Sequence, residues 1–372
     1  MKKLLLAGLI AGLCSGTVSA ADESDVAVQE DKGVRFNTAI GPFYDPIFDL
    51  AGSVIPTLAY EIGDAEKTSF TKLYGIYGTN GNYVVRADTN NFMGSNSEWY
   101  LTGTFNYSYA KLDVMDFMGM DPGPTVEVEN VAIIAEGSAQ YQIFDNAYFG
   151  PMVSYRTTEF ERDSSANPFG TVNMITDKSI MEYGLAFTFD NRDNTQTPTN
   201  GWFVEMNLSN QEVENTEGAT IPDAVPGLGG FTLNGDEEYY TVTTDIRTYL
   251  EINDDTIFAV RNKVIWNGDE AQDTLTALDK VAYGFTMEIA GRSAIGADFQ
   301  LRHWLTDTWG VVGTVGLAKA IDANDEDLHY AVGGGVRYML NPADKLSMRL
   351  DVTYSDQEED EMLVFFNVSE AF

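Results

Sequence analysis

Every second residue from 362 to 368 in the carboxy-terminal segment 362–372 is apolar, and no other segment of the 372-residue chain constrains the fold as strongly. Successive side chains of a strand point to opposite faces, so this alternation predicts a strand with one continuous apolar face. The strand stops at the aromatic residue Phe372. A final strand of this kind is typical of outer-membrane β-barrels, although an edge strand of a soluble sandwich shows the same period. The apolar positions are Met362, Val364, Phe366 and Val368.

The same alternation recurs along the chain. It is unbroken over 346–354, and it appears again over 240–250, 99–109 and 297–302. A soluble sandwich rarely contains so many long strands with aromatic residues near their ends, whereas such residues form the interfacial girdles of membrane barrels. The candidate girdle residues are Trp99, Tyr109, Trp202, Tyr239, Tyr249, Trp266 and Trp304.

We therefore predict an all-β fold, a transmembrane antiparallel β-barrel of about 16 strands with both termini in the periplasm, since bacterial barrels close with even numbers. A segment at 34–42 either adds a strand or replaces the doubtful one at 278–290. The short turns at 253–255, 306–307 and 341–344 are expected to face the periplasm, and the longer acidic loops the outside. The predicted strands are 49–61, 67–77, 81–89, 97–109, 128–143, 146–157, 180–190, 200–210, 236–251, 256–267, 278–290, 293–305, 309–320, 328–340, 345–355 and 362–372.

The amino terminus has the pattern of a secretory signal peptide. Basic residues Lys2 and Lys3 precede an apolar run over 4–13 and small residues at 18–20, and the run is too short to span a membrane as a helix. The only cysteine, Cys14, lies in the segment to be removed, so we expect no disulfides. The expected organisation is a cleaved signal peptide at 1–20, a short periplasmic tail at 21–33 and an outer-membrane barrel over 34–372.

The net charge of −35 excludes nucleic acid as a partner, because a protein binds phosphates through an excess of basic residues. Acidic runs at 236–238, 322–327 and 356–361 match no EF-hand spacing and are interpreted as solvated outer loops. His303 and His329 are the only histidines, and no Ser, His and carboxylate grouping has the spacing of a known catalytic site. We expect no enzymatic activity, no metal and no cofactor.

Charged side chains occupy positions that alternate with the apolar ones, and we expect them to face the lumen. Both signs are present, so mutual pairing is favoured over the selectivity lining of a porin. Pairing or water is required because burying a charge without a partner is costly. These residues are Asp245, Arg247, Arg261, Lys263, Asp298, Arg302, Arg337, Arg349 and Asp351.

A predicted turn after strand 180–190 has a distinctive composition. Asp190, Arg192 and Asp193 can form charge-assisted hydrogen bonds, Pro198 fixes φ, and Gly201 permits a conformation that other residues resist. A structural role for these residues is favoured over a catalytic one.

Three features in order resemble the barrel of the BamA/TamA superfamily, also called the bacterial surface antigen domain. The turn over 189–202 resembles the family's Asp-x-Arg-Asp and Pro-Thr-x-Gly turn. The run over 291–302 resembles the strand that follows the family's sixth loop. The family's closing strands are resembled by three segments, 333–338, 349–351 and 369–372. The resemblance covers roughly 180–372 by these motifs and 34–180 by general pattern.

In that family the sixth loop contains a Val/Leu-Arg-Gly-Phe/Tyr motif whose arginine reaches an acidic residue of the barrel wall. The counterpart here is 282–285, with Tyr283 at the position of the arginine. Arg292 is the candidate substitute, with Asp298 or Asp351 as its acidic partner. The family-like structural positions are Asp190, Arg192, Asp193, Pro198, Gly201, Gly284, Phe285, Arg292, Asp298, Arg337, Arg349, Asp351 and Phe372.

The resemblance implies a barrel in the outer membrane of a Gram-negative bacterium that aids insertion or translocation of proteins. Its partners are then outer-membrane lipid, lipopolysaccharide and unfolded outer-membrane or exported proteins. The family's assembly proteins carry periplasmic POTRA domains, and 21–33 is too short for one, so the chain resembles barrel-only members. The alternatives are a passive, porin-like channel or structural outer-membrane protein, and a surface receptor that uses the acidic loops at 322–327 or 356–361.

Overall fold

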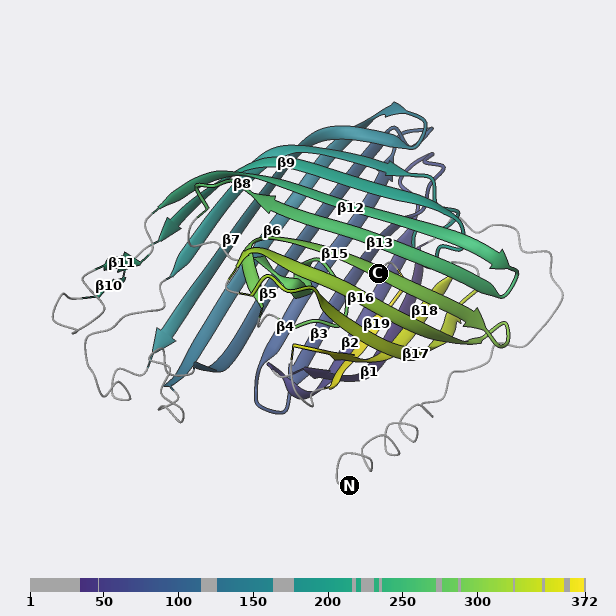
Figure 1. Cartoon of the computed structure of the whole chain (residues 1–372). Coiled ribbons are helices and arrows are strands. Elements are labelled where there is room, and N and C mark those ends of the chain that lie inside the picture. The colour runs from purple at the N-terminus through teal and green to yellow at the C-terminus, as the bar shows by residue number, and fades with distance from the viewer. Residues whose placement is uncertain are drawn as a thin grey trace, which may run out of the picture.

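The chain forms an antiparallel β-sheet that closes on itself as a barrel (Figure 1). No helix in the described part of the chain is long and apolar enough to cross a membrane. The expected signal peptide at 1–20, the expected periplasmic tail at 21–33 and Phe372 are not among the residues that the structure describes. This computed structural model describes residues 34–45, 47–114, 126–162, 177–215, 219–221, 231–233, 236–271, 276–286, 289–323, 325–342, 345–357 and 362–370.

The barrel sheet contains 17 strands among the described residues, of which β14 (Thr276–Ala277) covers only two residues on the edge of β15. Sixteen strands therefore form the wall, as predicted. A separate hairpin of β10 (Ala219–Ile221) and β11 (Phe231–Leu233) lies in the connection after β9. The wall strands are β1 (Arg35–Asp45), β2 (Asp49–Tyr60), β3 (Ser69–Gly78), β4 (Tyr83–Met93), β5 (Trp99–Val114), β6 (Val126–Phe144), β7 (Ala147–Arg162), β8 (Lys178–Asp190), β9 (Gly201–Asn215), β12 (Glu237–Asn253), β13 (Thr256–Asn267), β15 (Ala290–Trp304), β16 (Trp309–Ala323), β17 (His329–Asn341), β18 (Leu346–Ser355) and β19 (Met362–Val368).

The prediction of a wall strand at 278–290 was wrong, and the alternative strand at 34–42 is real. The first segment holds a 3₁₀ turn (Leu278–Lys280) and a loop, whereas the second lies in β1. Leu278, Val281 and Ala282 are buried against the inner wall. Their apolar character therefore comes from an inserted loop, which the sequence pattern alone does not distinguish from a strand.

The predicted alternation is confirmed in the wall strands. In β12, Leu250 is exposed on the outer face while Asp245 is buried on the lumen side. The outer face is consequently apolar and suits a lipid environment, where a closed barrel leaves no unpaired backbone. Trp99, Trp202 and Trp266 are exposed as expected, but Tyr239 and Tyr249 were assigned wrongly, because both are buried on the lumen side. Tyr239 and Tyr249 lie on the same face of β12 as Thr241, Asp245 and Arg247, and this face points to the lumen.

Because neighbouring wall strands are antiparallel and even in number, the start of β1 and the end of β19 lie at the same end of the barrel, here called the terminal end. The short turns after β12, β15 and β17 also lie there, as does the turn over 191–200 between β8 and β9. The acidic loops at 322–327 and 356–361 follow strands that run toward the opposite end. Which end faces the periplasm stays a prediction.

Candidate functional site

The junction between the first and last strands is the weakest pairing in the described wall. β1 pairs with β2 along its whole length, and β19 pairs with β18 from Met362 to Val368. Between β1 and β19 only Tyr44 and Val364 are aligned. Backbone hydrogen bonds hold the other wall strands together, so this junction, which we call the seam, is the place where the sheet separates at lowest cost.

Side chains close the seam where the backbone does not. Phe366 and Val368 of β19 cluster with Ala39 of β1 and Ile55 of β2, and the Phe366 ring leaves no room for a side chain at Gly41. Ala39 and Ile55 face the lumen.

The position of Phe366 shows how the last strand meets the first. Phe366 is aligned with Leu350, which is aligned in turn with Val336 on the exposed outer face. The outer side of β19 therefore packs on the inner side of β1, and the end of the last strand tucks behind the first.

The turn over 191–200 is built by short-range hydrogen bonds. Asp190 forms a two-pronged ion pair with Arg192 at 2.7 and 2.8 Å, and the Arg192 guanidinium stacks on Phe203. Asp193 accepts bonds from the N–H groups of Thr199 (2.9 Å) and Asn200 (3.1 Å). These contacts fix a compact turn, as the sequence predicted for this motif.

The Asp193 carboxylate also receives the Lys345 ammonium at 2.9 Å, which ties the turn to the loop after β17. Burial alone would raise the pKa of Asp193, but the hydrogen bonds from Asn200 and Thr199 and the Lys345 charge outweigh it and hold the pKa below its usual range. The carboxylate is therefore ionised at neutral pH.

The middle of this turn extends across the lumen to the strands near the seam. The Thr197 hydroxyl lies 3.1 Å from the Ser347 hydroxyl of β18, and the Pro198 carbonyl accepts a bond from Arg302 of β15 at 3.4 Å. Gln196 contacts the end of the chain itself. The turn thus partly fills the terminal end of the lumen and links the wall at β8 and β9 to the wall at β15 to β19.

The end of the described chain is held from inside the barrel. Glu370 is fully buried, and its carboxylate pairs with Arg337 and, at 3.6 Å, with Arg302. Its backbone N–H donates to the Gln196 carbonyl at 2.7 Å, and the Ser369 N–H donates to the Ser347 carbonyl at 2.7 Å. The last strand is therefore anchored to the inner wall and to the 191–200 turn more strongly than to β1.

The loop over 278–286 enters the barrel and lies along the inner face of β15 to β18. Val281 and Phe285 are buried with alanines of β15, β16 and β17. Gly284 adopts a positive φ of 88°, and a Cβ there would come within 3.1 Å of Ala331 and Thr353, so only glycine fits without strain. The glycine and phenylalanine of the predicted motif therefore serve close packing on the wall.

Tyr283, at the position of the family's arginine, reaches both acidic partners that the sequence proposed. Its backbone N–H donates to Asp298 at 2.8 Å, and its hydroxyl donates to Asp351 at 3.1 Å. The Arg349 guanidinium lies over its ring at 5.1 Å, and the Phe365 ring of β19 packs at 4.8 Å. Tyr283 therefore makes the contacts with acidic wall residues that the family's motif assigns to its arginine.

Arg292 does not substitute for the missing arginine. It pairs with Asp269 at 3.0 Å, in the loop after β13, and with Asp322, near the end of β16, both at the end of the barrel opposite the terminal end. The expectation that it meets Asp298 or Asp351 is therefore not met. Arg292 follows Gly291 at the start of β15, before the strand enters the lumen region where those two carboxylates lie.

The expected pairing of lumen charges is confirmed. Arg337 binds Asp351 through the two terminal nitrogens of its guanidinium, and Arg349 lies 3.9 Å from the same carboxylate. Asp245 pairs with Arg247 and Arg261 at 2.8 Å each. Buried ions of both signs lie side by side, which reduces the cost of their burial.

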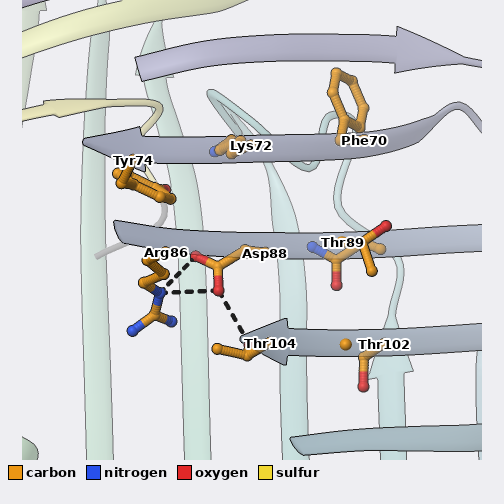
Figure 2. A pocket seen from close by; sticks show the side chains of 10 residues that line it. Phe70, Lys72, Tyr74, Arg86, Asp88, Thr89, Thr102 and Thr104 are labelled. Carbon is orange, nitrogen blue, oxygen red and sulfur yellow. Dashed lines mark hydrogen bonds and ion pairs between the residues drawn. The ribbon is translucent and has the colours of Figure 1, made fainter. Parts of the chain in front are cut away.

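A cavity of about 210 Å³ opens on the inner face of β3, β4 and β5. Figure 2 shows the side chains of these strands that line it. Asp88 accepts bonds from Arg86 at 2.9 Å and from Thr104 at 3.0 Å, and Lys72 donates to the Ser369 hydroxyl. Among the described residues, no three His, Cys, Asp or Glu side chains converge in a way that suits a metal ion.

Sequence reasoning missed several residues of the site. Lys72, Gln196 and Ser347 surround the last described residues, Ser369 and Glu370, but none of these three was singled out, and Glu370 entered only within the segment 369–372. The sequence offered one signal for this site. Glu370 lies in the closing segment of a membrane barrel, where a buried charge needs a partner of opposite sign.

A family model described as the Omp85 superfamily domain matches residues 81–297, more than half of the chain. The matched range includes the 191–200 turn and the 278–286 loop, and it extends into the first half of the barrel. No protein among the curated sequences matches the chain.

Three solved structures are similar in fold. BamA from Haemophilus ducreyi lacking POTRA domains 1–3 has a TM-score of 0.51 and 12% identity, over 98% of this chain and 78% of that one. CdiB from Acinetobacter baumannii has a TM-score of 0.54 and 7% identity, over 91% of this chain and 60% of that one. CdiB from Escherichia coli has a TM-score of 0.54 and 11% identity, over 92% and 63%. At these identities the likeness shows the barrel fold.

Proposed function

The chain belongs to the Omp85 superfamily, and on that premise we propose that it is an outer-membrane barrel that aids the insertion or translocation of other proteins by opening the seam between β1 and β19. The observation that supports this function is the single aligned residue pair, Tyr44 with Val364, between the two strands. The expected cleaved signal peptide at 1–20 would deliver the chain to the outer membrane.

An open seam would expose two strand edges. Unpaired N–H and C=O groups on an edge strand are a template for adding another strand, and main-chain hydrogen bonds then supply the affinity. An unfolded client strand is therefore the partner whose chemistry fits. The apolar outer face would hold the barrel in lipid, and lipopolysaccharide is the partner proposed for its outer rim.

The interior supports this role better than that of a passive channel. The 191–200 turn reaches Arg302 and Ser347 across the lumen, and the 278–286 loop reaches Asp298 and Asp351 along the wall. Both segments occupy space that a wide solute path would need.

A disulfide across the seam tests the proposal. We would replace Tyr44 and Val364 by cysteine in a Cys14→Ser background, since aligned residues of antiparallel strands are separated by about 4.5–5.5 Å between Cα atoms, a distance that a disulfide spans. The matched control crosslinks Ile40 to Val54 within the β1–β2 ladder. Both proteins are reconstituted in liposomes with an unfolded eight-stranded outer-membrane barrel as client, and protease-resistant client and release of a small solute are recorded together.

We expect the unmodified barrel to accelerate client folding, the oxidised seam variant to lose that acceleration, and a reductant to restore it. The oxidised control variant should keep full activity. Equal activity of the oxidised seam variant and the control would reject the seam mechanism. Solute release without any effect on client folding would instead indicate a channel.

A further inference from the structure

The last described residues, Ser369 and Glu370, occupy a pocket on the inner wall that the seam mechanism does not itself require. The Glu370 carboxylate is completely buried between Arg337 of β17 and Arg302 of β15. Taking such charges out of water is costly, and it is compensated only when each ion has a partner of opposite sign. The two guanidinium groups therefore make the pocket selective for a carboxylate.

The same pocket also binds the backbone of these two residues, which directly follow β19 and of which Ser369 has a positive φ of 79°. The Glu370 N–H donates to the Gln196 carbonyl at 2.7 Å, and the Glu370 carbonyl accepts a bond from Arg302 at 2.9 Å. One residue earlier, the Ser369 N–H donates to the Ser347 carbonyl at 2.7 Å. Main-chain hydrogen bonds combined with a side-chain pocket are a recurring means of binding a peptide segment.

The residue before the acid is recognised as well. The Ser369 hydroxyl donates to the Gln196 side-chain oxygen at 2.7 Å and accepts a bond from Lys72 of β3. Lys72 also lies 3.4 Å from the Val368 carbonyl. Groups from β3, β15, β17, β18 and the 191–200 turn thus converge on the two residues that directly follow β19.

We propose that this Glu370 pocket, formed by Lys72, Gln196, Arg302 and Arg337, is a binding site for the two residues that directly follow a terminal β-strand, where a small hydroxyl residue precedes an acidic one. The chain's own Ser369-Glu370 fills it while the seam is closed. The end of a client strand with the same chemistry fills it when β19 moves away from β1. The identity of the second occupant rests on the proposed function, whereas the recognition of serine and glutamate does not.

The chain's own Ser369-Glu370, here called the C-terminal tail, has an advantage over any free peptide because it is covalently attached to the barrel. A ligand attached through a short linker competes at an effective concentration in the millimolar range. A free peptide is therefore expected to bind poorly to the wild-type barrel and well to a barrel whose own tail has lost its carboxylate. Glu370→Gln removes the charge while keeping the shape of the side chain.

The first experiment measures binding of a fluorescently labelled peptide with the sequence of residues 362–372 to detergent-solubilised barrel. We expect at least tenfold tighter binding to Glu370→Gln than to wild type, and at least tenfold weaker binding when the peptide's glutamate is replaced by glutamine. The matched control is Glu251→Gln, which neutralises an exposed glutamate of β12 and should behave as wild type. Binding that does not depend on the peptide's glutamate, or that is equal for all three proteins, would overturn the proposal.

A second measurement covers the case in which Glu370→Gln fails to fold. Ser369→Cys in a Cys14→Ser background places a thiol of nearly the same size in a site that is buried in the closed state. Excess peptide should raise its rate of maleimide labelling severalfold, and the glutamine peptide should not. An unchanged rate with the native peptide would count against displacement of the tail.

Client folding in liposomes is recorded separately. Glutamate-dependent peptide binding without any acceleration of client folding would keep the pocket and reject the proposed function. Acceleration without glutamate-dependent binding would keep the function and reject the pocket.

Discussion

Asp351→Asn is the substitution that most directly tests the buried charges of the lumen. The Asp351 carboxylate, 1% exposed, binds Arg337, accepts the Tyr283 hydroxyl and lies 3.9 Å from Arg349. Asparagine has the same shape, so the change removes the charge and leaves the packing. Arg337 keeps Glu370 as a partner, but Arg349 loses the one acidic group that the described residues place within 4.0 Å of it.

The expected cost follows from that loss. Removing one partner of a buried ion pair costs about 3–5 kcal/mol, because the remaining charge stays buried without compensation. Arg349 is 6% exposed at its side chain, and two of its nitrogens have no hydrogen-bond partner among the described residues. We therefore expect the free energy of unfolding to fall by about 3 kcal/mol, the lower end of that range, since the Tyr283 ring still lies over the guanidinium.

Urea unfolding in phospholipid vesicles, followed by tryptophan fluorescence and gel mobility, measures the change. Arg349→Gln alone should cost less than Asp351→Asn, and the double variant should recover about 1–2 kcal/mol relative to Asp351→Asn. Asp254→Asn, at an exposed turn, is the control and should stay within about 0.5 kcal/mol of wild type. Strict additivity of the two lumen substitutions would refute the assignment of Arg349 as the charge that Asp351 compensates.

Two further predictions concern the 191–200 turn. Gly201 has a φ of 110°, and a Cβ there would come within 2.7 Å of Arg192 Cα. Gly201→Ala should therefore lower the urea midpoint by an amount equivalent to about 1–3 kcal/mol. The control Gly52→Ala, where a Cβ would have no atom within 4 Å, should have little effect. Because the folded-state pKa of Asp193 is lowered, its contribution is present above the unfolded pKa of about 4 and is lost as pH falls through the folded value. The difference in urea midpoint between wild type and Asp193→Asn should therefore be constant near neutral pH and shrink below about pH 4, and a constant difference down to pH 2 would contradict this.

Alternation was enough to predict the barrel, because the side-chain period of a strand is two and the lumen and lipid faces differ in polarity. It failed where an apolar segment does not lie in the wall. The 278–286 loop packs Val281 and Phe285 on alanines of the inner face, and an inserted loop and a strand both present short apolar runs. Tyr239 and Tyr249 were misplaced for a related reason: an aromatic residue near a strand end suits a lipid interface or a lumen equally, and only the register decides.

The parts of the site were predicted to different extents. Asp190, Arg192, Asp193 and Gly201 form a turn through bonds between residues close in sequence, so their composition was sufficient. The contact between Gln196 and Ser369 joins residues 173 positions apart, and no periodicity reports such a distance. Long-range polar contacts of this kind depend on where the barrel closes, which the sequence pattern does not specify.

Backbone pairing between strands is sparsest at the seam, whereas side-chain contacts inside the lumen are dense on the wall beside it. Backbone ladders extend along the other neighbouring strands and are nearly absent at the seam. Most of the buried charges, together with the last described residues, lie on the wall from β15 to β19 beside the seam. A ladder breaks one hydrogen bond at a time, while a buried ion such as Glu370 leaves its pocket only when another carboxylate or water replaces its partners. A seam held mainly by side chains therefore resists random fraying and still opens to a ligand of the right charge, which a continuous ladder between β1 and β19 would not do.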